Sequence, residues 1–190
     1  FGSQTSAISA TGQYPSGDIA NVESWDGSSW SEIADVNQAR IAMGKATSIA
    51  GNSLGLLFGG GPGGKNETES WNGSAWTELN NLNTGRRYLS GFGLSTSALG
   101  FGGETATAGS VNLVESWNGT SWTEVAEVNT GRQGGSAAGD TNVLGIYFGG
   151  GSSLLTEAWN GTAWTEVNDL AAAKNEGSGS GTSNAAFVVL

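Results

Sequence analysis

Two kinds of hydrophobic pattern alternate along the chain. Segments 154–160 (LLTEAWN) and 163–170 (AWTEVNDL) alternate apolar and polar residues with a period of two, as half-exposed β-strands do. Segment 142–150 (NVLGIYFGG) is a short apolar run ending in two glycines, which is typical of a buried strand. Segment 132–140 (RQGGSAAGD) consists mainly of small residues and suits a crowded inner strand. Together these segments predict a unit of four short strands.

The same unit recurs along the chain. Its clearest marker is a pair of tryptophans, found at Trp25/Trp30, Trp71/Trp76, Trp117/Trp122 and Trp159/Trp164. The first members are 46, 46 and 42 residues apart. An apolar-Phe-Gly-Gly element recurs at 56–60, 99–103 and 146–150, and a basic residue follows ten positions after each pair, at Arg40, Arg86, Arg132 and Lys174. Four strands in each such repeat are the pattern of a β-propeller blade.

These motifs resemble kelch repeats over all 190 residues. The shared features are the apolar-Phe-Gly-Gly strand end, an aromatic residue before the turn, a Trp after it and an Arg opening the next unit. The aromatic residues lie closer together than in typical kelch units, and the variant ESWNG[ST]xWTE is similar to the kelch-like arrays of marine bacteriophage structural proteins. The resemblance implies an all-β, kelch-like β-propeller of four-stranded antiparallel blades.

The repeats predict a single domain, 1–190, with four units of approximately 1–57, 58–100, 101–147 and 148–190. The chain begins with FGS and finishes with AAFVVL, and the two joined end to end recreate the apolar-Phe-Gly-Gly element. We therefore expect the N- and C-terminal strands to share one blade, with strands from 174–190 completing the first unit. Such closure removes open sheet edges. The alternative is an arc of a larger propeller.

The tryptophan pairs flank Asn-Gly or Asp-Gly, a strong hairpin signal that places both rings on one side of a sheet. They could stack on sugars, or they could pack between blades and bury about 150–250 Å² each. A ligand site does not need identical copies in every unit, whereas a core does, so we assign all eight tryptophans a structural role. The Asn-Gly-Ser/Thr sequences also match glycosylation sites, but turn formation already accounts for them.

Composition excludes several classes of function. The chain has 33 glycines, no cysteine, no histidine and a net charge of −10. The negative charge argues against nucleic-acid binding, which requires clustered basic residues. Catalytic triads and zinc sites built on His or Cys are impossible. The repeated glutamates could bind Ca²⁺, but ion pairs with the repeated arginines are the simpler interpretation. We expect no enzyme activity, no cofactor and no metal.

Binding residues are expected where the repeats differ, chiefly in the loops between second and third strands and in nearby connections. The candidates are Tyr14, Asp18, Lys65, Asn66, Glu67, Arg86, Arg87 and Tyr88. With no apolar run near the roughly 18 residues of a membrane span, we expect no membrane insertion.

The resulting hypothesis is a non-enzymatic structural or adhesion module of a virion or cell surface. Its expected partners are other virion or surface proteins and a host glycan or receptor. The alternatives are an intracellular, cytoplasmic kelch-type scaffold for protein interactions and a purely architectural repeat with no ligand.

Overall fold

The computed structural model describes residues 1–47, 52–182 and 184–189, in which all regular elements are strands. The first sheet contains β1 (Gly2–Ser3), β2 (Ser6–Tyr14), β3 (Gly17–Trp25) and β4 (Trp30–Glu32). The second contains β5 (Gly44–Thr47), β6 (Gly55–Phe58), β7 (Thr68–Trp71) and β8 (Trp76–Leu79). The third contains β9 (Ser90–Leu94), β10 (Ser97–Phe101), β11 (Val114–Trp117) and β12 (Trp122–Glu124). The fourth contains β13 (Ser136–Thr141), β14 (Leu144–Phe148), β15 (Thr156–Trp159) and β16 (Trp164–Val167), and β17 (Ser178–Thr182) pairs with β18 (Ala185–Val189).

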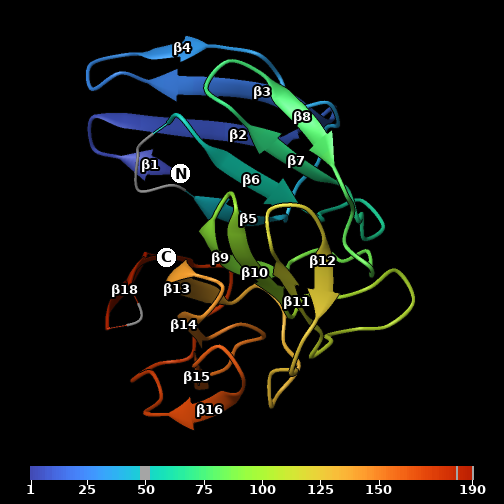
Figure 1. Cartoon of the computed structure of the whole chain (residues 1–190), viewed down its shortest axis with the longest axis vertical. Coiled ribbons are helices and arrows are strands. Elements are labelled where there is room, and N and C mark those ends of the chain that lie inside the picture. Colours follow the sequence, from blue (N-terminus) through green and yellow to red (C-terminus); the bar gives the residue numbers. More distant parts are fainter. Residues whose placement is uncertain (48–51, 183, 190) are drawn as a thin grey trace.

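The sheets are arranged as successive propeller blades (Figure 1). Each strand pairs antiparallel with the next strand along the chain. The first strands β1, β5, β9 and β13 gather near the two termini, whereas β4, β8, β12 and β16 lie on the outside. The inner strands β5 and β9, β9 and β13, and β13 and β17 lie side by side. The predicted all-β fold with four-stranded antiparallel blades is confirmed.

Strand register shows which residues are equivalent. Phe58 and Phe101 pair with the first residues of β7 and β11, and Ala10 pairs with Val22 at the same place in the first sheet. The element Ala10-Thr11-Gly12 therefore replaces Phe-Gly-Gly in the first repeat. Phe1 pairs with Ile8 through main-chain hydrogen bonds, as Phe92 pairs with Leu99 within β9 and β10. The N-terminal Phe-Gly thus belongs to a first, inner strand.

The termini consequently do not share a blade in the part of the chain that the structure describes, contrary to our expectation. The first sheet is complete with its own β1 and β2, so no strand from 174–190 joins it. Strands β17 and β18 form a separate sheet, which corresponds by its register to the inner half of a further blade. The misassignment arose because the first repeat lacks the Phe of its second strand, so the Phe-Gly at the N-terminus was aligned with the wrong element.

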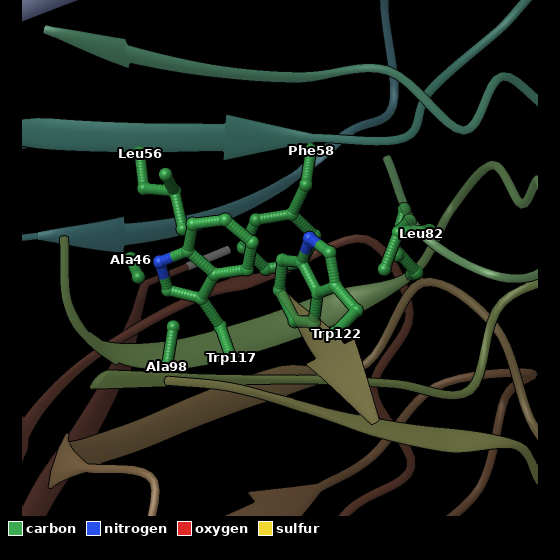
Figure 2. Packing of buried hydrophobic residues seen from close by; sticks show 8 residues of the cluster. Ala46, Leu56, Phe58, Leu82, Ala98, Trp117 and Trp122 are labelled. Atoms are coloured by element: carbon green, nitrogen blue, oxygen red, sulfur yellow. The ribbon is translucent and has the colours of Figure 1, made fainter. Parts of the chain in front are cut away.

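The core lies between adjacent sheets, and Figure 2 shows the cluster between the second and third. Trp117 and Trp122 reach across to the second sheet, where Phe58 and Leu56 receive them. The rings of Phe58 and Trp122 meet edge to face at 4.8 Å, and the indole N–H of Trp122 donates to the hydroxyl of Thr68 at 3.0 Å. Equivalent clusters join the first sheet to the second and the third to the fourth. The tryptophan pairs of the second, third and fourth sheets therefore pack against the preceding blade, whereas Trp30 of the first sheet is exposed.

Buried ion pairs accompany this core. Arg40 pairs with Glu69, Arg86 with Glu115 and Arg132 with Glu157, and all six residues are buried. Each arginine lies in the connection before a sheet, and its glutamate lies on the third strand of that sheet. The guanidinium groups also donate to main-chain carbonyl groups, which reduces the cost of burying the charges. The repeated charges thus fasten each connection to the following blade.

Candidate functional site

Tyr14 and Asp18 lie at the end of the hairpin formed by β2 and β3. The hairpin is long because both strands have nine residues, whereas the strands that form the equivalent hairpins have four or five. Tyr14 is 62% exposed, and Gln13 donates a hydrogen bond to the carboxylate of Asp18. Part of the chain that looked like a loop from sequence is therefore strand, and only its tip presents these two side chains.

Lys65, Asn66 and Glu67 lie in the connection between β6 and β7, and all three are half-buried. The ammonium group of Lys65 donates to the side-chain oxygen of Gln38, and the main-chain carbonyl of Glu67 accepts from Arg40. These contacts hold the connection against the preceding interblade segment, so the three candidates form part of a packed loop.

Arg86 does not suit the binding role that we expected. Its side chain is fully buried, and it donates to Glu115 at 3.0 Å and to the carbonyl of Leu113 at 2.9 Å. Burial lowers its pKa, and the neighbouring Glu115 opposes that shift. A partner cannot reach this guanidinium, so Arg86 holds the scaffold together. The adjacent Arg87 is partly exposed and pairs with Glu104.

Tyr88 belongs to a ring of four equivalent residues, each two positions after a repeated basic residue. Ala42, Tyr88, Gly134 and Glu176 have φ angles of 53°, 53°, 64° and 55°. Tyr88 N–H donates to the carbonyl of Ala42 at 2.7 Å, Gly134 N–H to Tyr88 at 2.9 Å, and Glu176 N–H to Gly134 at 2.7 Å. Left-handed backbone is uncommon outside glycine, and here it allows successive blades to bond to each other through main-chain groups.

Three bonds join the four ring residues in series, and all four residues line the mouth of a central channel. A cavity of about 580 Å³ is lined by all four ring residues and by inner-strand residues of all five sheets. A second cavity of about 590 Å³ continues from it and shares Lys45, Gly91, Ala137 and Gly179 among its lining residues. The mouth therefore carries Tyr88 and Glu176, whose side chains differ from those at equivalent positions. Beside it, the Arg87 guanidinium lies 5.5 Å from the centre of the Tyr88 ring.

Sequence reasoning missed Lys45 and Glu176, although both differ from their repeat equivalents. Lys45 on β5 corresponds by strand register to Gly91, Ala137 and Gly179. Its side chain is exposed to the channel, yet the surrounding protein lowers the pKa of the ammonium group by desolvation. Alignment of the small-residue strands could have found this substitution.

Within the described ranges, no group of three or more Asp or Glu residues is arranged to hold a metal ion. The same part of the chain contains no helix that is long and apolar enough to cross a membrane. The arrangement around the channel offers an aromatic ring, one free ammonium group, hydroxyls and main-chain amides. Such groups can form stacking contacts, ion pairs and hydrogen bonds.

Comparison with known proteins supports the class of fold. No protein-family profile matches the sequence, and no curated protein is similar to it. Among solved structures, the chain is similar to YjhT with a TM-score of 0.71 and 11% sequence identity. The match covers 85% of this chain and 63% of YjhT, so the chain spans less than two-thirds of that protein's length. The protein has a β-propeller-like repeat fold.

Proposed function

We propose that the protein is a non-enzymatic structural and adhesion module of a virion or cell surface, which binds its partner through the face around the channel mouth. The observation that carries this proposal is a division between repeated and unrepeated residues. The repeated tryptophans and Arg–Glu pairs form the interblade core. The unrepeated Tyr88 and Glu176 line the mouth of the channel, and Arg87, which pairs with Glu104, lies beside the Tyr88 ring.

The chemistry of this face favours a glycan on a host or partner surface. Tyr88 supplies an aromatic ring on which a sugar could stack, and the exposed Glu176 supplies a carboxylate acceptor for hydroxyl groups. The ring of main-chain hydrogen bonds keeps these side chains in place before binding, which reduces the entropic cost of recognition. The sequence resemblance to phage structural repeats supports placing the module on a virion.

A glycan array probed with fluorescently labelled protein tests the proposal. We expect binding to a limited set of glycans, with about a five- to thirtyfold loss for Tyr88→Ala, because one stacking contact contributes on the order of 1–2 kcal/mol. Tyr14→Ala is the matched control, since Tyr14 is exposed on a hairpin tip and does not line the channel.

Three results would argue against this face. The first is absence of binding to glycans and to intact host cells, which would favour a purely architectural role. The second is undiminished binding by Tyr88→Ala. The third is loss of binding by Tyr14→Ala alone, which would move recognition to the β2–β3 hairpin.

A further inference from the structure

Lys45 has a long side chain at a position of the inner strand where the equivalent strands carry glycine or alanine. The equivalent residues Gly91, Ala137 and Gly179 lie at the same level of the channel, and all of them line both cavities. Lys45 therefore stands where the two halves of the channel meet. The blade itself does not require a lysine at this position, because three other inner strands form with a residue no larger than alanine there.

The first sheet provides the space that this lysine needs. At Gly91, an added Cβ atom would lie 2.5 Å from the ring of Phe58 in the preceding sheet, so that position admits no side chain. The residue equivalent to Phe58 in the first sheet is Ala10, as strand register shows. Two departures from the repeat, Ala10 and Lys45, therefore occur together on adjacent sheets, and Ala10 leaves more room beside β5 than a phenylalanine would.

The lysine is available for a ligand. In the ranges that the structure describes, Lys45 is the only lysine or arginine lining either cavity, and no carboxylate lies within ion-pair distance of its ammonium group. The two carboxylates that line the cavities, Glu176 and Asp140, belong to opposite halves of the channel. The positive charge of Lys45 thus lies where the two cavities meet, and each cavity has one carboxylate in its lining.

We propose that Lys45 binds the carboxylate of a small, hydroxylated monoanion inside the channel. Cavities of about 580 and 590 Å³ are within the size range of small-molecule sites. The lining of the first cavity combines apolar residues such as Ile8 and Leu57 with several glycines and with Ser136 and Ser178, so it offers hydroxyl and main-chain groups to such a ligand. Desolvation already disfavours the unpaired ammonium form, and an anion would relieve this cost.

The arrangement of charge favours a monoanion over a phosphate ester. Phe1 also lines both cavities, and burial lowers the pKa of its amino group to about 6, so Lys45 carries the main positive charge at neutral pH. Lys45 balances one negative charge, whereas the second charge of a phosphate would remain without a partner in a channel that also contains Glu176 and Asp140. This site shares the first cavity with Tyr88 and Glu176, but its test depends on Lys45 and not on glycan recognition at the mouth. Either proposal can fail while the other holds.

The experiment uses D-glucuronate as the probe, with D-glucose as its neutral analogue and glucose 6-phosphate as the dianion. Binding to the full chain is measured by calorimetry, and the ¹³Cε resonances of labelled lysines report which lysine the probe reaches. We expect glucuronate to shift the Lys45 resonance and to bind more tightly than the other two sugars. Lys45→Met should weaken glucuronate binding about tenfold or more, because it removes a charge-assisted hydrogen bond.

Two further variants sharpen the test. Lys45→Arg keeps the charge and should retain most of the binding. Lys65→Met removes a lysine that lies outside the channel lining and should leave binding unchanged. The proposal is overturned if glucuronate does not bind, if it binds Lys45→Met as well as the unaltered protein, or if glucose binds equally well. If the Lys45→Met variant fails to fold, the unaltered protein still provides a test, because glucuronate must shift the Lys45 resonance if it binds there.

Discussion

The first and third tryptophan hairpins have the same local geometry and opposite surroundings. The Trp25 and Trp30 rings are 5.5 Å apart at 42°, and those of Trp117 and Trp122 are 5.3 Å apart at 42°. Trp30 is nevertheless 49% exposed, whereas Trp122 is 6% exposed and packs on Phe58. The hairpin sequence sets the position of each ring relative to its partner, but only a neighbouring sheet buries it.

The same contrast applies to charge. Glu115 is buried against Arg86, whereas the equivalent Glu23 is exposed and has no ion pair among the described residues. One repeated sequence therefore gives a core element in the third sheet and a surface element in the first. Energetic contributions should differ accordingly, and variants at equivalent positions measure the difference.

The largest difference is expected for the second tryptophan. Trp122→Ala should lower the free energy of unfolding by about 3–5 kcal/mol, as for other buried large-to-small substitutions, while Trp30→Ala should cost under about 1 kcal/mol. Urea denaturation of both variants beside the unaltered protein measures this. Equal losses would show that Trp30 is buried in solution, against the exposure described here.

The ion pairs should give the next difference. Arg86→Met leaves Glu115 buried without its partner and should cost about 3 kcal/mol, because removing one member exposes the full desolvation cost of the other. Glu23→Gln changes an exposed side chain and should alter the free energy of unfolding by less than about 0.5 kcal/mol. The double variant Arg86→Met, Glu115→Met should recover part of the loss. If it recovers none, packing of the Arg86 side chain matters more than its charge.

The smallest expected difference between the first and third repeats is in the acid sensitivity of their tryptophan-hairpin turns. Asp26 accepts hydrogen bonds from the main-chain N–H groups of Ser28 and Ser29, as Asn118 does from Thr120 and Ser121. These bonds, with that from the Ser28 hydroxyl, lower the Asp26 pKa to about 2. Because the folded-state pKa is depressed, the stabilisation is present above the ordinary value near 4 and is lost as pH falls through about 2.

The measurement is an NMR titration of the Asp26 carboxyl group, with urea denaturation at pH 2 and pH 5. Asp26→Asn should remove this contribution to acid sensitivity, since an amide makes the same turn without titrating. Asn118→Asp is the reciprocal variant and should introduce a similar sensitivity in the third repeat. A normal pKa for Asp26 would mean that its turn is not formed as described.

Much of the blade could be predicted from sequence because its signals are local and repeated. The four strands of the fourth sheet agree with the patterns of small, apolar and alternating residues that predicted them. The turn between Trp71 and Trp76 has four residues, and the oxygen of Asn72 accepts from the N–H groups of Ser74 and Ala75. Such interactions depend only on nearby residues.

The errors occurred where a residue's role depends on distant neighbours. Arg86 looked available because it precedes Arg87 and Tyr88 in a variable region, but its partner Glu115 comes from a strand 29 residues away. The first repeat was misaligned because Ala10 replaces its phenylalanine. Lys45 could be recognised as a channel residue only from the structure, because strand register makes it equivalent to Gly91 and Ala137 of two other sheets.

The ring of Ala42, Tyr88, Gly134 and Glu176 separates the architecture of the channel mouth from its chemistry. Its bonds use only main-chain groups, so residues as different as alanine, tyrosine, glycine and glutamate can stand at the four positions. The remaining constraint is stereochemical, since left-handed backbone favours Gly, Asn and Asp. A combinatorial library at Ala42, Tyr88 and Glu176 should therefore yield variants with divergent selectivity, whereas substitution of Gly134 strains its left-handed backbone and should lower the melting temperature. Lineages that carry this scaffold could acquire new specificities by the same route.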